Sequence, residues 1–239
     1  MATRTPRFFF SLRSPYSWLA YHDLTVRRPD LTGSVEWVPY WEPDAAMRQV
    51  LGDLGGEFLY TEMHKAKQLY LLQDVRRLAQ ARGFAVTWPV DREPAWEVPH
   101  LAYLAAAEFG RGHDFIRGVH EARWQLGRDI CDPATVGRIA ERIGLDPDRI
   151  AGAHQIPRIR AAGVRSLLIA YQTGVFGVPF LVAGRQKFWG LDRLDGFLDA
   201  IGAAPATVPA TVPDDLVPPE AVAVGAGRGG DGGHAGGCG

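Results

Sequence analysis

Three patterns of hydrophobic and polar positions follow one another along the chain, and each predicts different elements. Residues 7–12 are rich in aromatic side chains and predict a buried strand. Pro15 suits the first position of a helix and Ser14 its N-cap, so a helix is expected from there to about Arg28. Residues 34–40 alternate valines and aromatic residues with polar ones, which predicts a second strand. The amino end is therefore expected to form a β-α-β unit.

From about residue 42 the apolar positions lie three or four residues apart, which is typical of helices. The pattern predicts apolar helix faces at Leu71, Leu72, Val75, Leu78 and Ala79, over residues 100–110, at Phe115, Val119, Ala122 and Leu126, and at Val136, Ile139, Ala140 and Ile143. Gly83 is expected to end the first of these helices. Asp132 followed by Pro133 predicts the start of another, and a later helix is expected to end near Gly174.

Strand character returns near the carboxyl end. Residues 180–190 predict a hairpin that turns at Gly184, and residues 191–202 predict a closing helix with one apolar face. The remaining segment, 203–239, is rich in proline and glycine. It cannot bury enough apolar surface to offset the entropy of ordering, so it is expected to be disordered.

This order of elements predicts an α/β fold of the thioredoxin-like type, βαβ…ββα, with an inserted all-helical domain. The thioredoxin-like domain would consist of residues 7–41 and 175–202. The inserted helical domain would span residues 42–174, and the Pro/Gly-rich tail would begin at residue 203.

The composition is that of an ordinary globular protein, with 46% hydrophobic and 22% charged residues. The net charge of −1 argues against a broad electrostatic surface for nucleic acid. There is no run of about 18 apolar residues, and the amino end resembles a strand rather than a signal peptide. The two cysteines, Cys131 and Cys238, are not expected to pair. These features predict a cytoplasmic protein that binds neither nucleic acid nor membrane.

Ser14 is the first candidate for chemistry because it lies where a strand passes directly into a helix. A helix N-terminus carries partial positive charge and unpaired N–H groups, which stabilise an anion placed there. The alternative role is an N-cap, worth about 1 kcal/mol of stability. The histidines show no metal-ligand spacing such as H-E-x-x-H, so no metal is expected. Trp37, Tyr40 and Trp41 follow the second strand and are expected to face the site.

Three segments, "SLRSPYSWLA", "RWQLGRDICDP" and "GVFGVPFLVAGRQKFWGLDRL", resemble the 2-hydroxychromene-2-carboxylate isomerase family. This family is related to kappa-class glutathione transferases within the DsbA-like thioredoxin superfamily, and the resemblance covers about residues 7–200. In it, Ser14 and Ser17 occupy the places of the two cysteines of a C-x-x-C motif. Without those thiols, disulfide exchange at this site is chemically unavailable. The resemblance implies instead that the protein binds an exogenous thiol, usually glutathione, with Ser14 bonded to its sulfur.

The resemblance also implies which residues hold the thiol. "GVPF" matches a segment with a cis proline, so the backbone of Val178, before Pro179, is expected to pair with the thiol peptide. Asp192 matches the aspartate that contacts the glutamyl amine of glutathione. Lys67 matches the lysine that contacts the glycyl carboxylate. The family often has an asparagine before this lysine, but this chain contains no asparagine, which leaves another low-molecular-weight thiol open as the cofactor.

The substrate implied is a small unsaturated or aromatic molecule. The residues expected to line its pocket are Tyr16, Ser17, Tyr40, Trp41 and Phe180. The favoured function is a thiol-dependent cis-trans isomerase of an unsaturated aromatic oxo- or hydroxy-acid. Two alternatives stay open: a kappa-like glutathione transferase, and a non-catalytic accessory protein with the same fold. Relatives often form dimers, so a homodimer is the assembly that the resemblance suggests.

Overall fold

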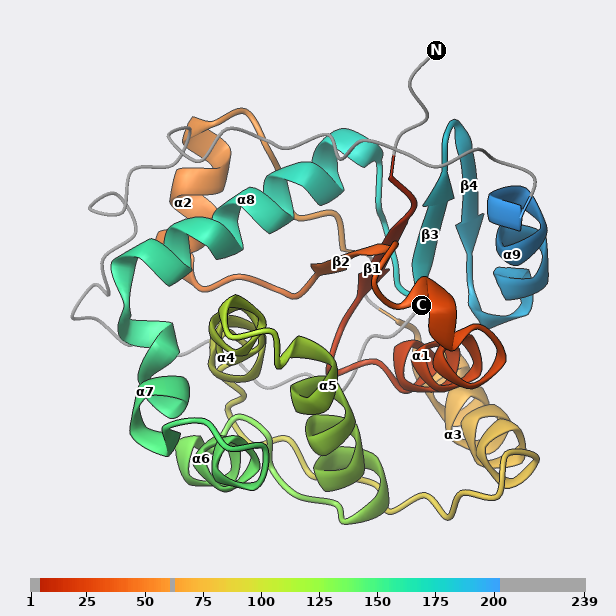
Figure 1. The fold of residues 1–239 in the computed structure, drawn as a ribbon, viewed down its shortest axis with the longest axis horizontal. Coiled ribbons are helices and arrows are strands. Elements are labelled where there is room, and N and C mark those ends of the chain that lie inside the picture. The colour runs from red at the N-terminus through yellow and green to blue at the C-terminus, as the bar shows by residue number, and fades with distance from the viewer. Residues whose placement is uncertain (1–4, 61–62, 203–239) are drawn as a thin grey trace.

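The computed structural model describes residues 5–60 and 63–202, and the expected tail lies outside them. A mixed four-stranded sheet runs through the described part in the order β2-β1-β3-β4 (Figure 1). The strands are β1 (Arg7–Phe10), β2 (Glu36–Pro39), β3 (Phe180–Ala183) and β4 (Gln186–Trp189). β1 is parallel to β2 and antiparallel to β3, which is antiparallel to β4. Two segments distant in sequence thus build one sheet.

β1 is apolar at successive positions because both faces of the sheet are covered. Phe8, Phe9 and Phe10 are all fully buried or nearly so. Side chains alternate between the faces of a strand, so Phe9 points away from its two neighbours. Its ring lies 6.3 Å from that of Phe180, while the ring of Phe10 lies 5.1 Å from that of Tyr103. The helical block therefore packs on one face of the strand that leads to Ser14.

The helices occupy the positions that separate and flank the strands (Figure 1). They are α1 (Pro15–Arg27), α2 (Ala45–Asp53), α3 (Lys65–Gln80), α4 (Glu97–Glu108), α5 (Gly112–His120), α6 (Pro133–Arg142), α7 (Pro147–Ala151), α8 (Pro157–Thr173) and α9 (Leu194–Gly202). α3 lies beside α1, and α9 packs against the hairpin of β3 and β4. The predicted order of strands and helices is confirmed.

The local signals at helix ends are borne out. Ser14 caps α1, with its Oγ accepting a hydrogen bond from the backbone N–H of Ser17 at 3.1 Å. Asp132 caps α6 in the same way. Gly174 ends α8 with φ 77°, and Gly184 turns the β3–β4 hairpin with φ 61°. Both angles lie in the left-handed region that glycine adopts without steric cost.

Two predicted apolar positions are wrong. Leu72 is 40% exposed because α3 buries a narrow stripe four residues apart, formed by Leu71, Val75 and Ala79. Leu126 is 54% exposed because a π-helical turn, Glu121–Gln125, follows α5 and changes the direction in which later side chains point. Regular 3.6-residue spacing does not hold through such a turn.

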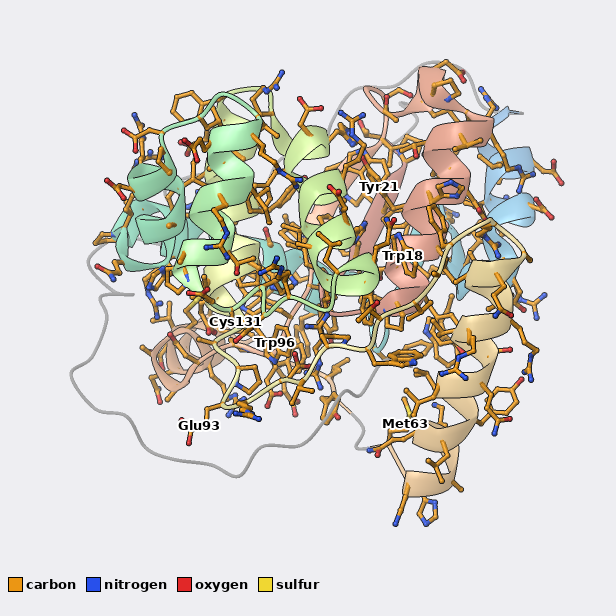
Figure 2. All side chains as sticks on the ribbon, turned by 90° about the horizontal axis from the view of Figure 1, so that it is seen from below. Trp18, Tyr21, Met63, Glu93, Trp96 and Cys131 are labelled. Carbon is orange, nitrogen blue, oxygen red and sulfur yellow. The ribbon has the colours of Figure 1, made fainter. Side chains whose placement is uncertain are left out.

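α1 joins the sheet to the helical block through its aromatic side chains, which Figure 2 labels at Trp18 and Tyr21. The ring of Trp18 stacks 6.0 Å from that of Trp124, and Tyr21 meets His120 edge-on at 5.5 Å. Among the described helices, none is both long and apolar enough to span a lipid bilayer.

Candidate active site

The turn between β1 and α1, residues 11–14, is fixed by hydrogen bonds within the chain. The N–H of Ser14 donates to the carbonyl of Ser11 at 3.0 Å, and the N–H of Ser11 donates to Ser17 Oγ at 3.3 Å. Ser14 Oγ also donates to the carbonyl oxygen of Val178 at 3.4 Å. The side chain of Ser14 is fully buried. The hydroxyl thus connects the start of α1 to the segment that enters β3.

A histidine from α4 completes this turn. His100 Nε2 accepts a hydrogen bond from the N–H of Leu12 at 3.0 Å and lies 3.2 Å from Ser11 Oγ. Its Nδ1 lies 2.7 Å from the carbonyl of Trp96, which requires a proton on that nitrogen. Burial lowers the pKa of His100 to about 3, so the ring is neutral at physiological pH and keeps Nε2 as an acceptor.

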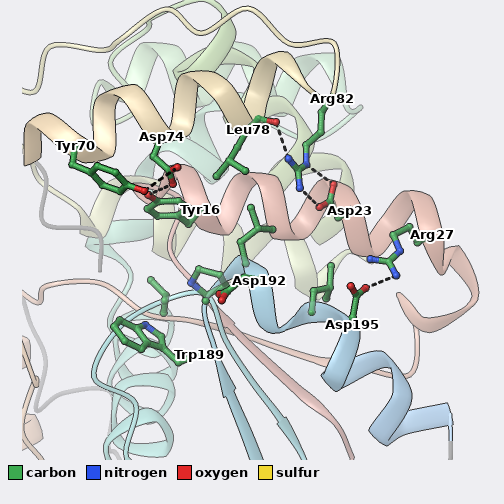
Figure 3. Close-up of a pocket in the computed structure, with 15 residues that line it drawn as sticks. Tyr16, Asp23, Arg27, Tyr70, Asp74, Leu78, Arg82, Trp189, Asp192 and Asp195 are labelled. Atoms are coloured by element: carbon green, nitrogen blue, oxygen red, sulfur yellow. Dashed lines mark hydrogen bonds and ion pairs between the residues drawn. The ribbon is translucent and has the colours of Figure 1, made fainter. Parts of the chain in front are cut away.

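A cavity of about 630 Å³ opens between α1 and α3 on one side and the β4–α9 connection on the other (Figure 3). We call it the acidic cavity because its charged lining consists of Asp23, Asp74, Asp192, Asp195, Arg27 and Arg82. Tyr16, Val178 and Pro179 line it as well. Four carboxylates against two guanidinium groups favour a cationic or hydroxyl-bearing ligand.

Most of these carboxylates are already paired. Asp23 receives two hydrogen bonds from Arg82, and Asp195 lies 2.6 Å from Arg27 (Figure 3). Asp74 accepts from the hydroxyl of Tyr16 at 2.8 Å. Asp192 differs in its pairing: its ion pair with Arg193 is long, at 3.5 Å, whereas the equally exposed Asp195 is held by Arg27. Asp192 is therefore the exposed carboxylate of this cavity that is held most weakly by a partner.

A second cavity of about 280 Å³ lies at the end of β2. We call it the aromatic cavity because six of its lining residues carry aromatic rings: Tyr40, Trp41, Phe58, Tyr60, Phe176 and Trp189. Its charged lining residues are Arg13, Lys67 and Glu42. An apolar pocket with a few charged groups suits a planar organic ion.

The two cavities share two lining residues, and fully buried Ser14 lines neither cavity but bonds to one of the two. Val178 and Trp189 line both, and Val178 is the residue whose carbonyl accepts the hydrogen bond from Ser14. The peptide bond between Val178 and Pro179 is cis, as the resemblance implies. Within residues 5–60 and 63–202, no three His, Cys, Asp or Glu side chains lie close enough together to hold a metal ion.

Comparison with known proteins decides the family. The DsbA-like thioredoxin domain family matches residues 7–202. A 2-hydroxychromene-2-carboxylate isomerase from Sphingobium xenophagum is 31% identical over 207 residues, which cover 83% of this chain and 97% of the relative. The chain belongs to this isomerase family. An isomerase of the same name from Pseudomonas putida is 26% identical over 82% of this chain and 93% of its own length.

Solved structures agree on the fold of this isomerase. The structure of a 2-hydroxychromene-2-carboxylate isomerase aligns with a TM-score of 0.65 and 21% identity, covering 82% of this chain and 94% of the other. A probable DsbA oxidoreductase from Streptomyces coelicolor aligns with a TM-score of 0.61 and 18% identity, covering 86% and 93%. The predictions of a thioredoxin-like α/β fold with a helical insertion and of an isomerase are therefore confirmed.

The residues expected to bind the thiol are divided between the cavities. Asp192 and Pro179 line the acidic cavity, Lys67 lines the aromatic cavity, and Val178 lines both. Lys67 is exposed near the start of α3.

The residues expected to line the substrate pocket are also divided between the two cavities. Tyr40 and Trp41 line the aromatic cavity, whereas Tyr16 lines the acidic cavity. Trp37 points elsewhere, with its ring 4.8 Å from that of Phe8 in the core. Within the isomerase, Tyr40 and Trp41 come after β2 ends, and Trp37 lies inside β2.

Two predicted pocket residues do not line either cavity. Ser17 is fully buried because its Oγ accepts from the N–H of Ser11. Phe180 is 2% exposed because its ring packs against those of Phe9 and Phe176. Both are core residues: Ser17 holds the turn before α1, and Phe180 packs on one face of the sheet.

Sequence reasoning missed His100 and the position of Arg13. His100 is 89 residues from Ser11, and its spacing carries no motif. Arg13 could have been found, because an arginine directly before Ser14 is forced to lie near the turn. The structure places it in the wall of the aromatic cavity.

Proposed function

We propose that this isomerase is thiol-dependent and interconverts the cis and trans forms of an unsaturated aromatic oxo- or hydroxy-acid. The observation that supports this most directly is the position of Ser14. It caps α1 and bonds to Val178, which lines both the acidic and the aromatic cavity. A thiol and an aromatic acid need two such environments on either side of one reacting sulfur.

The proposed cofactor is glutathione or another low-molecular-weight thiol. The accessible carboxylate of Asp192 suits an ammonium group, and the exposed Lys67 suits a carboxylate, as glutathione carries at its two ends. The backbone of Val178 lies between them and suits an extended peptide. When bound, the thiol supplies a nucleophile whose reversible addition turns the double bond into a rotatable single bond, and whose expulsion restores the double bond.

Ser14 would hold the sulfur of this thiol. Its hydroxyl proton now donates to the Val178 carbonyl across 3.4 Å, which is long for an O–H···O bond and therefore weak. Turning that proton toward a thiolate exchanges a weak hydrogen bond for a charge-assisted one. The positive end of the α1 dipole adds to this preference for an anion.

Calorimetry of glutathione binding tests the thiol. We expect wild-type protein to bind glutathione and release protons near neutral pH, with less release in Ser14→Ala. This substitution also removes an N-cap, so Asp132→Ala is the matched control, because Asp132 caps α6 and lines neither cavity. Proton release as in wild type from Asp132→Ala, but not from Ser14→Ala, would support the role of Ser14.

The reaction itself is tested with 2-hydroxychromene-2-carboxylate, the compound that names the relatives. We expect isomerisation only when thiol is present, with the thiol concentration unchanged at the end. A stable adduct that consumes thiol would indicate a transferase instead. No binding at millimolar glutathione would reject that thiol, and turnover without any thiol would reject the thiol dependence.

A further inference from the structure

Gly190 lies directly after β4, where the chain turns toward α9, and its backbone has a conformation that suits glycine alone. Its φ is 104° and its ψ is 159°, a combination that a Cβ atom makes costly for every other residue. Gly190 lines the acidic cavity together with Leu191 and Asp192, and Figure 3 labels Asp192 at this cavity. The turn that leads to Asp192 therefore depends on a residue without a side chain.

The carboxylate of Asp192 lies directly against this glycine. A Cβ atom on residue 190 would lie 2.7 Å from Oδ1 of Asp192 and 4.0 Å from its Cγ. A separation of 2.7 Å is shorter than the contacts that real Cβ atoms make, so a side chain at this position would displace the carboxylate. The missing side chain of Gly190 thus leaves the space that the Asp192 carboxylate occupies.

We propose that Gly190 is a positioning residue, which holds the Asp192 carboxylate at the acidic cavity and so makes the isomerase prefer a cofactor thiol that carries an ammonium group. This rests on the proposed function, in which Asp192 receives the amine of the thiol. Gly190 itself would contact no ammonium group. It acts on the ligand only through the carboxylate that lies against it.

Backbone hydrogen bonds tie Gly190 to the candidate active site. The N–H of Gly190 donates to the carbonyl of Pro179 at 2.9 Å. The residue before this proline is Val178, whose carbonyl accepts from Ser14 Oγ at 3.4 Å. The position of Asp192 relative to Ser14 is therefore set through the segment that lies between the two cavities. An acceptor that is already ordered loses little conformational entropy when it binds a ligand.

The side-chain partner of Asp192 contributes less to its position than the backbone does. The ion pair between Asp192 and Arg193 is 3.5 Å long, and the two side chains are 73% and 64% exposed. Exposed pairs of this kind stabilise a conformation only slightly. By contrast, the N–H of Arg193 donates to the carbonyl of Gly190 at 3.2 Å and closes the turn around Asp192. The orientation of Asp192 therefore follows mainly from the turn that Gly190 begins.

Calorimetry with two thiols tests the proposal: glutathione, and glutaryl-cysteinylglycine, which is the same molecule without the glutamyl amine. We expect wild type to bind glutathione about two- to fivefold more tightly, the range for a pair of partly exposed charges. Gly190→Ala places a Cβ atom against the Asp192 carboxylate. It should therefore bind the two thiols with about equal affinity.

Gly184→Ala is the matched control for backbone strain. Gly184 also has a positive φ, 61°, but a Cβ atom there would meet nothing within 4 Å, and the residue lines neither cavity. This variant strains the hairpin without reaching a carboxylate, so it should keep the preference of wild type for glutathione. Loss of the preference in both glycine variants would overturn the role of Gly190, because strain in the hairpin would then explain both.

A double-mutant cycle tests whether Gly190 acts through Asp192. Asp192→Ala alone should abolish the preference for glutathione. Adding Gly190→Ala to it should then change the affinity for either thiol less than about twofold. If the double variant instead loses as much further affinity as Gly190→Ala loses alone, Gly190 does not act through the carboxylate and the proposal is rejected.

Asp192→Glu keeps the question testable where Gly190→Ala fails to fold, as circular dichroism would show. Its carboxylate is one methylene group farther from the backbone and no longer fits against Gly190, so the preference for glutathione should fall below that of wild type. An unchanged preference in Asp192→Glu would overturn the proposal, because the exact position of the carboxylate would not matter.

Proton release separates this inference from the proposed function. Release on thiol binding depends on Ser14 in the proposed function, so Gly190→Ala should release protons as wild type does. Equal affinity of wild type for the two thiols, with normal proton release, would overturn the role of Gly190 and leave the proposed function standing. No binding of either thiol by wild type at millimolar concentration would reject glutathione as the cofactor and, with it, the role of Gly190.

Discussion

The most direct test of how the site is built is to change one nitrogen of His100 at a time. The amide nitrogen of an asparagine lies near the place of Nδ1, whereas the end of a glutamine reaches the place of Nε2. His100→Asn therefore keeps the contact with the Trp96 carbonyl and loses the one with the Leu12 N–H. His100→Gln does the reverse. Both lose the ring that stacks 5.0 Å from Trp41.

The two variants should differ because the partners of the histidine are unequal. Leu12 is fully buried, so its N–H loses its acceptor in His100→Asn, at about 1–3 kcal/mol for an unsatisfied buried donor. The Trp96 carbonyl keeps a backbone hydrogen bond from the N–H of residue 100, so its loss in His100→Gln costs about 0.5–1.5 kcal/mol. The loss of the ring is common to both and cancels. We expect His100→Asn to be about 1 kcal/mol less stable than His100→Gln.

Urea unfolding measures this difference, and amide hydrogen exchange locates it. Exchange of the N–H groups in residues 11–14 should accelerate in His100→Asn more than in His100→Gln, while exchange in α6 stays as in wild type. Equal stability losses with unchanged exchange in the turn would refute the reasoning. His100 would then fill space in the core without positioning the turn that carries Ser14.

Three further substitutions test buried titratable side chains. Burial, and next the charge of Asp44, raise the pKa of Glu97 to about 7. The neutral carboxyl therefore stabilises the fold at low pH, and this stability is lost as the pH rises from about 4.5 to 7. Urea titrations at pH 8 should find Glu97→Gln about 1–3 kcal/mol more stable than wild type. His120 is buried, neither of its ring nitrogens has a hydrogen-bond partner among the described residues, and burial lowers its pKa to about 3. Wild type should therefore lose stability as the pH falls from about 6.5 to 3. His120→Leu should reduce the slope of unfolding free energy against pH by up to about 1.4 kcal/mol per pH unit, and an unchanged slope would contradict this argument. Asp91→Asn leaves Arg123 buried without its carboxylate and should lower the unfolding free energy by about 3–5 kcal/mol, whereas a change below about 1 kcal/mol would show that the pair is not needed.

The features that the sequence predicted are those that local chemistry determines. The N-caps at Ser14 and Asp132 and the turn at Gly184 depend on residues that are neighbours in the chain. The run of buried aromatic residues in β1 likewise belongs to one strand, both faces of which are covered. The sequence could not predict the partner of Leu12, because His100 reaches it only after the helical block has folded. Spacing cannot encode a contact between segments that fold together from distant positions.

The site is correspondingly divided between local and long-range determinants. The contact of the α1 start with the cis-proline segment follows from the motif that carries Ser14 and Val178, but the acidic and aromatic cavities could not be predicted, since each is lined from several elements. Lys67 and Asp192 were expected in one thiol site and lie in the two different cavities. Only a ligand that extends past Val178 joins them. The three-dimensional arrangement thus sets a minimum length for the proposed thiol, which no single motif could do.

The first turn of α4 connects these determinants. Trp96 supports Arg13, and His100 holds the turn before Ser14. Between them, the Glu97 carboxylate accepts from the N–H of Asp44, whose side chain caps α2 and pairs with Arg160 of α8 at 2.6 Å. A single turn of helix therefore joins the sheet, the site and two helices of the block. It follows that the helical block positions the turn that carries Ser14, and that substitutions over residues 96–100 should alter ligand binding at the candidate site without contacting the ligand.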